Sequence, residues 1–261
     1  THTTSSAASD VYKRQVLETS GSVKRFVLNT VGSAYTLAPD VTFSSGTAQA
    51  TAVLANGGVI QTITIINGGT GYTSGTISVT VDPPPQNTFV ADEINNGVAT
   101  VDTTANTITI QGHYLETGYQ MTYDITTLDA TATAIGGLSA GTYYAIKVDN
   151  NTIKVASSLS NANAGNAISL SSGGTGTQLF IGVTAQVSPT IAGGVITGVT
   201  VTNGGSGYSS AATITVTDSG SGAGGQLSPV VGFPLSELTV SGGGTYTCLL
   251  YTSPSPRDGI G

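Results

Sequence analysis

Residues 57–74 read GGVIQTITIINGGTGYTS, and residues 193–210 read GGVITGVTVTNGGSGYSS. Each copy holds an alternating segment, then Asn-Gly-Gly-x-Gly, then a tyrosine. In the first copy Val59, Ile63 and Ile65 fall on one face of an extended chain and threonines fall on the other, which predicts a half-buried strand. The glycines predict a turn, because they tolerate positive φ. We expect the tyrosine to fold back over the apolar face with its hydroxyl near water.

Weaker copies of the same pattern occupy residues 26–43 and 238–246, so that each copy carries a marker tyrosine: Tyr35, Tyr72, Tyr208 and Tyr246. Their spacings of 37, 136 and 38 indicate a unit of about 37 residues, and the long spacing leaves room for roughly 100 extra residues. We therefore expect an inserted β domain over residues 86–182, between β-repeat regions at 16–85 and 183–247. Prolines 83–85 mark the start of the insertion, because a proline run cannot continue a central strand.

The predicted insertion contains a β-hairpin signal around the turn at residues 149–152, Asp-Asn-Asn-Thr. One apolar face is expected to run through both of its strands: Tyr144, Ile146, Val148, Ile153 and Val155. Other segments of this region also alternate. Residues 107–110 and 168–170 predict strands, and residues 158–164 favour one short helix that stops at Gly165. The fold class expected is all-β, with Gly-rich β-repeat units of about 37 residues and an inserted β-sandwich or barrel-like domain.

The composition excludes several classes of protein. Of 261 residues only 8% are charged, 36 are glycine and none is tryptophan, which is unlike a coiled coil or a helical bundle. The formal charge of −7 argues against a nucleic-acid partner, which a basic surface would indicate. No apolar run approaches the roughly 18 residues that a membrane-spanning helix needs. We therefore expect neither nucleic-acid binding nor a membrane span.

Both ends of the chain match translated sequencing adapters. Residues 5–15 read SSAASDVYKRQ, the in-frame translation of a transposase-type adapter, and residues 248–258 read CLLYTSPSPRD, the translation of the opposite one. On this interpretation residues 1–15 and 248–261 are non-native, and residues 16–247 are a metagenomic fragment of a longer reading frame. The fragment keeps four basic and twelve acidic residues and loses Cys248, the single cysteine. Disulfides, thiol catalysis and cysteine-bound zinc are therefore not expected.

Three features could carry chemistry. His113, the sole histidine of residues 16–247, could be a general base beside Glu116, but a role in holding a loop between strands is favoured. The Gly-rich stretches lead into strands rather than helices, so they lack the helix N-terminus of a phosphate site. They also place Tyr72 or Ser209 where a calcium-binding repeat needs aspartate. We therefore expect no enzyme activity, and assign no catalytic residue, no cofactor-binding residue and no metal ligand.

The remaining carboxylates are scattered along the predicted insertion: Asp92, Glu93, Asp102, Glu116, Asp124, Asp129 and Asp149. A glycosidase needs only two facing carboxylates, so this list leaves a sugar-cleaving site open. Sugar clefts commonly use stacking aromatics, and the chain has no tryptophan. The favoured interpretation is that these acids lie on a solvated surface.

The stretch GGVITGVTVTNGGSGYSSAATITV, residues 193–216, resembles β repeats of virion structural proteins of tailed phages. Residues 107–123 and 133–177 resemble a β module of phage tail proteins and of large bacterial surface proteins. A histidine, then leucine or an aromatic residue, then glycine precede a strand in that module, and the matching positions are His113, Leu115, Gly118, Met121 and Tyr123. Both families are architectural. The resemblance implies a virion component of the tail, baseplate or fibre that assembles with other virion proteins or with copies of itself as a homo-oligomer, with contact to the host surface as a further role.

Two alternatives stay open at this point. The first is the repeat region of a secreted or surface adhesin of bacteria, which a signal peptide or wall anchor in the longer reading frame would distinguish. The second is a carbohydrate-binding or polysaccharide-degrading tail module. It would need Glu116 and another acid roughly 5–9 Å apart in one groove.

Overall fold

The computed structural model describes residues 13–17, 23–28, 32–43, 49–95, 97–242 and 250–252. Most of the segments interpreted as adapter translation lie outside these residues, as does the marker Tyr246. The chain is 51% β-strand with almost no helix, in several sheets of which none is closed among the described residues. The predicted all-β class is therefore confirmed. The chain divides into two compact units, one of Thr1–Ala55 with Gly232–Gly261 and one of Asn56–Val231.

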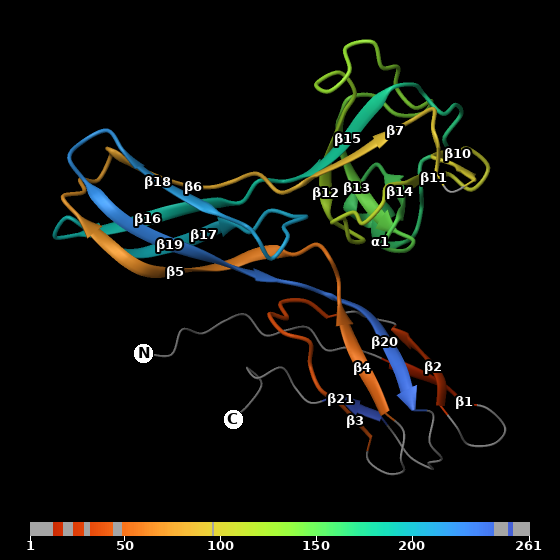
Figure 1. Ribbon diagram of the computed structural model, residues 1–261, viewed down its shortest axis with the longest axis horizontal. Helices are drawn as coiled ribbons and strands as arrows, with labels where there is room; N and C mark the ends of the chain where they lie inside the picture. The colour runs from red at the N-terminus through yellow and green to blue at the C-terminus, as the bar shows by residue number, and fades with distance from the viewer. Residues whose placement is uncertain are drawn as a thin grey trace. The chain divides into compact units, whose positions relative to one another are not determined.

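The first unit joins the two ends of the described chain through antiparallel pairs (Figure 1). Its strands are β1 (Lys13–Leu17) with β2 (Val23–Leu28), β3 (Val41–Phe43) with β21 (Leu250–Thr252), and β4 (Gln49–Leu54) with β20 (Leu235–Gly242). Tyr35 is buried and exchanges two backbone hydrogen bonds with Phe233, at 3.0 and 2.9 Å. Residues 13–15 and 250–252, which the adapter interpretation makes non-native, lie in β1 and β21.

Six strands of the second unit form three antiparallel pairs (Figure 1). These are β16 (Gln186–Ala192) with β17 (Val195–Asn203), β18 (Ile214–Asp218) with β6 (Ile77–Val81), and β19 (Ala223–Gly232) with β5 (Val59–Thr70). β5 also lies beside β17, and β16 beside β6. Two of the three pairs thus join segments that are far apart in the sequence.

The predicted alternation in β5 is confirmed. Ile63 and Ile65 are half-buried, whereas Thr62 and Thr64 are exposed. The predicted turn at Asn-Gly-Gly is wrong for the first copy, because β5 continues through these residues to Thr70. The long strand β19 pairs with β5, which extends the ladder past the position where local sequence predicts a turn.

Residues 86–182 supply a seven-stranded antiparallel sheet, whose strands are labelled in Figure 1, and its core. The strands are β7 (Gln86–Val90), β10 (Val101–Asp102), β11 (Thr107–Thr109), β12 (Gln120–Asp124), β13 (Gly141–Lys147), β14 (Thr152–Ala156) and β15 (Thr177–Gly182). Their order in the sheet is β10-β11-β14-β13-β12-β15-β7, and a separate hairpin joins β8 (Ile94–Asn95) to β9 (Val98–Ala99). Large side chains fill the core, including Phe89, Ile108, Leu115, Met121, Tyr123, Ile135 and Phe180.

The hairpin of β13 and β14 is confirmed, but its predicted faces are wrong. Directly opposed residues share one face of a sheet, and Ala145 lies opposite Val155. Val155 and Ile153 therefore join the main core with Ala145. Tyr144 and Ile146 pack on the other face, so the apolar stripe changes face across the turn. Val148, the remaining member of the predicted stripe, is exposed.

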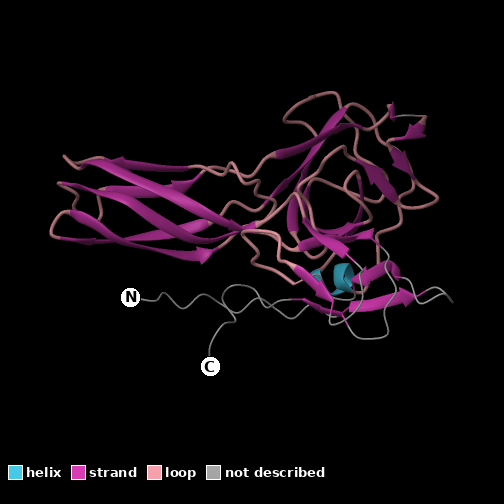
Figure 2. Cartoon of the chain, turned by 60° about the horizontal axis from the view of Figure 1, so that its bottom comes forward, coloured by secondary structure: helices cyan, strands magenta, loops and turns pink. Residues whose placement is uncertain are grey.

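The predicted short helix is confirmed as α1 (Leu159–Asn163), shown in cyan in Figure 2. The Ser158 hydroxyl accepts a hydrogen bond from the backbone N–H of Asn161 at 3.1 Å, and Gly165 follows with a φ of 76°. Ala162 of α1 packs against Ile146. Residues 168–170 form no strand, so that prediction is wrong. The N–H of Ile168 bonds to the carbonyl of Val155, whereas that of Leu170 bonds to the side chain of Asn106, so the two do not pair with one neighbouring strand.

Candidate functional site

The marker tyrosines of the two 18-residue copies, Tyr72 and Tyr208, make equivalent buried hydrogen bonds. Tyr72 is 5% exposed and its hydroxyl accepts the backbone N–H of Gly225 at 2.8 Å. Tyr208 is 1% exposed and its hydroxyl accepts the backbone N–H of Ala185 at 2.7 Å. The expectation that these hydroxyls lie near water is therefore wrong. Each one satisfies the backbone at the start of a strand, β19 or β16, and so has a structural role.

The polar and glycine residues before each tyrosine are also used by the backbone. The side-chain oxygen of Asn67 accepts the N–H of Gly69, and that of Asn203 accepts the N–H of Gly205, both at 2.9 Å. Gly69 and Gly205 have φ values of 64° and 65°, a backbone conformation that residues other than glycine rarely adopt. The first stretch is thus a local bend at the end of β5, and the second follows the end of β17. Both lie against neighbouring backbone, because a Cβ at Gly69 would lie 2.5 Å from the Ala223 oxygen and one at Gly205 would lie 2.3 Å from the Val183 oxygen.

The two copies also contact each other reciprocally. The backbone N–H of Tyr72 donates to the carbonyl of Gly194 at 3.0 Å, and that of Tyr208 donates to the carbonyl of Gly58 at 3.0 Å. The end of each copy thus bonds to the beginning of the other. The exchange places the marker tyrosine of each copy beside the glycine pair that opens the other copy.

His113 lies in the loop between β11 and β12 and is 2% exposed. Its Nδ1 accepts the backbone N–H of Leu115 at 3.2 Å, which confirms the predicted role in holding a loop. Its Nε2 is buried with no hydrogen-bond partner among the described residues. Burial lowers the pKa of His113, and the charge of Lys147 lowers it further, while the backbone of Thr152 and Asp149 acts in the opposite direction.

Glu116 pairs with Lys147 instead of with His113. The Lys147 Nζ lies 2.6 Å from Glu116 Oε1, and both side chains are largely buried. Burial raises the pKa of Glu116, whereas the charge of Lys147 and its hydrogen bond lower it. Burial, and next the charge of Glu116, raise the pKa of Tyr119, whose hydroxyl donates to the carbonyl of Gly57 at 3.3 Å. The structure therefore places Glu116 in a buried ion pair rather than on a groove.

The scattered aspartates act mainly as acceptors within turns. Asp102, Asp124, Asp129 and Asp149 each accept a backbone N–H from a residue two positions on. Bonds from Thr127 lower the pKa of Asp124, and bonds from Thr131 lower that of Asp129. A local signal for this role was present in the sequence, because threonine stands two residues after three of these aspartates.

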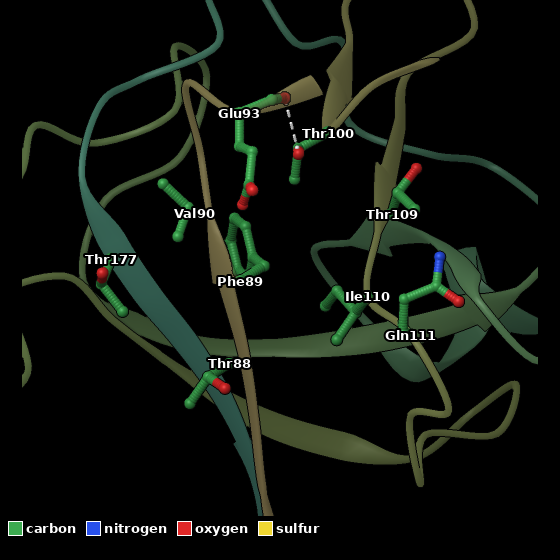
Figure 3. Close-up of a pocket in the computed structure, with 9 residues that line it drawn as sticks. All are labelled: Thr88, Phe89, Val90, Glu93, Thr100, Thr109, Ile110, Gln111 and Thr177. Atoms are coloured by element: carbon green, nitrogen blue, oxygen red, sulfur yellow. Dashed lines mark hydrogen bonds between the residues drawn. The ribbon is translucent and has the colours of Figure 1, made fainter. Parts of the chain in front are cut away.

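Sequence reasoning missed a pocket of about 250 Å³ at the seven-stranded sheet (Figure 3). Its lining comes from β7 and β15, from the segments before β8 and before β10, and from the end of β11 with the two residues after it. The lining residues are Thr88, Phe89, Val90, Glu93, Thr100, Thr109, Ile110, Gln111 and Thr177. Figure 3 shows the Glu93 side chain extending toward the Phe89 ring. No local pattern in the sequence marks this site, because the sheet order brings together residues from separate segments between positions 88 and 177.

The described part of the chain holds no group of three or more His, Cys, Asp or Glu side chains placed to bind a metal ion. Nor does any helix there have the length and apolar character needed to cross a membrane. Among the described residues, the features that stand out are the Tyr72 and Tyr208 hydrogen bonds, the Glu116–Lys147 pair and the pocket of Figure 3. In comparisons with known proteins, no family model, curated protein or solved structure matches this chain.

Proposed function

We propose that this chain is a structural component of a tailed-phage virion, in the tail, baseplate or fibre. Its β-repeat units flank an inserted β domain over residues 86–182. One observation carries the proposal: the Tyr72 and Tyr208 hydroxyls bond to backbone N–H groups, and Gly69 and Gly205 lie directly against neighbouring backbone. A pattern used in this way builds a scaffold rather than a reactive site.

The path of the chain supports the insertion. β6 and β16 lie beside each other, and the chain between them forms the seven-stranded sheet. Prolines 83–85 separate β6 from β7. A segment that leaves and returns at neighbouring strands can be added to a scaffold with few lost backbone hydrogen bonds.

Assembly with copies of itself or with other virion proteins is part of this proposal. β7 and β10 are the end strands of the seven-stranded sheet, so each has one edge without a strand partner among the described residues. A strand edge without a partner favours pairing with another chain. The resemblance of residues 193–216 and 107–123 to phage tail modules points the same way.

The test is to locate the protein in its source material. Virus-like particles are separated from cells on a density gradient, and both fractions are analysed by peptide mass spectrometry. Chymotrypsin suits this chain, because residues 16–247 contain only four sites for trypsin but nine of the eleven tyrosines. Peptides from 16–247 in the particle band, together with tail proteins, are the expected result.

The same experiment has outcomes that would overturn the virion proposal or the adapter interpretation separately. Peptides confined to the cell-envelope fraction would overturn the virion proposal in favour of an adhesin. Peptides from residues 1–15 and 248–261 are expected in neither fraction. Their detection, joined to residues 16 or 247, would overturn the adapter interpretation while leaving the virion assignment to be decided by the particle band.

A further inference from the structure

The pocket of Figure 3 lies between the two ends of the seven-stranded sheet. β7 and β10 are the end strands in the sheet order, yet the lining includes residues of β7 and residues at the end of β11, the neighbour of β10. The pocket therefore occupies the seam where the sheet curves round without closing. The backbone of β7 lies on one side of the pocket, and the backbone at the end of β11 lies on the other.

The base of the pocket is apolar and fixed. Phe89 is 6% exposed and its ring stacks on Phe180, with centroids 5.8 Å apart and planes 11° from parallel. Ile110 is 2% exposed. These side chains belong to the main core, so the base is held in place before any ligand arrives, which lowers the entropy cost of binding.

The wall beside the base is also held in place. The Thr100 hydroxyl and backbone N–H both donate to the carbonyl of Glu93, at 2.7 and 2.9 Å. The carbonyl of Thr100 in turn accepts the N–H of Thr109 at 2.7 Å. Glu93 is thereby tied to the edge of the sheet through its backbone, and its carboxylate remains available to a ligand.

Polar side chains surround the apolar base without bonding to one another. Within the described structure no hydrogen bond occupies the side-chain oxygens and nitrogen of five lining residues: Thr88, Glu93, Thr109, Gln111 and Thr177. Hydroxyl, amide and carboxylate groups around an apolar base match a ring that has C–H faces and several hydroxyls. We propose that this pocket binds one neutral sugar ring.

Size and charge narrow the ligand class. A pocket of about 250 Å³ is smaller than the roughly 300–1,000 Å³ of sites for drug-sized ligands, so it suits a single ring at the end of a glycan. Glu93 is the only charged residue in the lining, and it disfavours uronic acids and phosphates. Glycoside hydrolysis uses two carboxylates, so the site is one for binding. This inference goes beyond the proposed function, because it rests on the pocket alone.

The experiment measures binding of methyl glycosides to the full chain by saturation-transfer NMR and calorimetry. The probes are the methyl glycosides of glucose, galactose, mannose and N-acetylglucosamine, with that of glucuronic acid as the charged comparison. We expect saturable binding of at least one neutral glycoside and weaker binding of the glucuronide. Thr109→Val should weaken binding by about 3- to 10-fold and Glu93→Ala by about 10-fold or more, as expected for one neutral and one charge-assisted hydrogen bond.

Matched controls lie outside the pocket. Thr217→Val changes an exposed threonine of β18, and Asp40→Ala removes an exposed carboxylate of the other unit, so both should leave binding unchanged. Circular dichroism checks that every variant keeps its fold. The proposal is overturned if no neutral glycoside binds saturably up to about 50 mM, well above the millimolar Kd expected for one ring. It is also overturned if the controls weaken binding as much as the pocket variants do.

Discussion

Replacing Lys147 with methionine should destabilise the second unit substantially. The Lys147 Nζ lies 2.6 Å from Glu116 Oε1, and the two side chains are 13% and 10% exposed. Methionine keeps the length of the side chain but removes the charge, so Glu116 is left buried without its cation. Breaking a buried ion pair from one side costs about 3–5 kcal/mol, and the residual exposure of this pair favours the lower end, about 3 kcal/mol.

The assay is urea and thermal unfolding of the full chain. The chain has no tryptophan, so unfolding is followed by circular dichroism and tyrosine fluorescence. A loss of about 3 kcal/mol should lower Tm by roughly 6–12 °C, taking 2–4 °C per kcal/mol for a body of this size. In the double variant K147M/E116Q the buried charge is gone, and about 2 kcal/mol of the loss should be recovered.

The dependence on pH provides a second check. Burial raises the pKa of Glu116 above its ordinary value of 4.5, and removal of Lys147 takes away the groups that oppose this rise. A carboxyl with a raised folded-state pKa binds its proton more tightly in the folded chain, so its penalty is absent below about pH 4.5 and grows as pH rises through the folded-state pKa. The deficit of K147M relative to the parent should therefore shrink at low pH. A single variant that loses less than about 1 kcal/mol at pH 7, or a double variant less stable than the single one, would refute this reasoning.

Three further perturbations test other parts of the structure. Tyr208→Phe and Tyr72→Phe should each lower the free energy of unfolding by about 1–3 kcal/mol, because each leaves a buried backbone N–H unsatisfied. Urea unfolding that showed a loss of stability for only one of them would contradict their equivalent roles. Gly182→Ala should unfold or strongly destabilise the chain, because a Cβ there would lie 2.0 Å from the backbone oxygen of Ser206. The control is Gly198→Ala, whose Cβ would meet no atom closer than 3.6 Å, so this variant should retain the parent's Tm within a few degrees. His113→Gln should flatten the pH dependence of stability below pH 6.5, because burial lowers the folded-state pKa of His113 and the parent therefore loses stability as pH falls through that pKa. An equal loss of unfolding free energy between pH 7 and pH 5 in the two proteins would count against it.

Local patterns predicted the elements that depend on near neighbours. The alternation around Ile63 and the turn at residues 149–152 both depend on a few adjacent residues, and the structure contains both. The same holds for α1, where Ser158 bonds the first turn and Gly165 ends the helix. Each of these signals is complete within about ten residues, so tertiary contacts were not needed to read it.

Features that depend on distant partners could not be predicted from the sequence. The Tyr72 hydroxyl bonds to Gly225, 153 residues away, so its burial could not be inferred from the glycine-rich stretch that precedes it. The face occupied by Ile153 depends on the register across the hairpin, which the pattern of hydrophobic residues alone does not fix. The pocket needs Phe89 and Ile110 from two separated strands, and no spacing in the sequence marks that pairing.

The pairing of β6 with β18 has a consequence for synthesis in the cell. Asp82, next to β6, bonds to the hydroxyl of Thr213, 131 residues later in the chain. At the usual translation rate of roughly 5–20 residues per second, β6 leaves the ribosome about 7–26 s before its partner. During that interval its edge is open to other nascent chains, while the seven-stranded sheet in between is completed first. Production at low temperature and low expression level should therefore favour the correctly paired protein over aggregates.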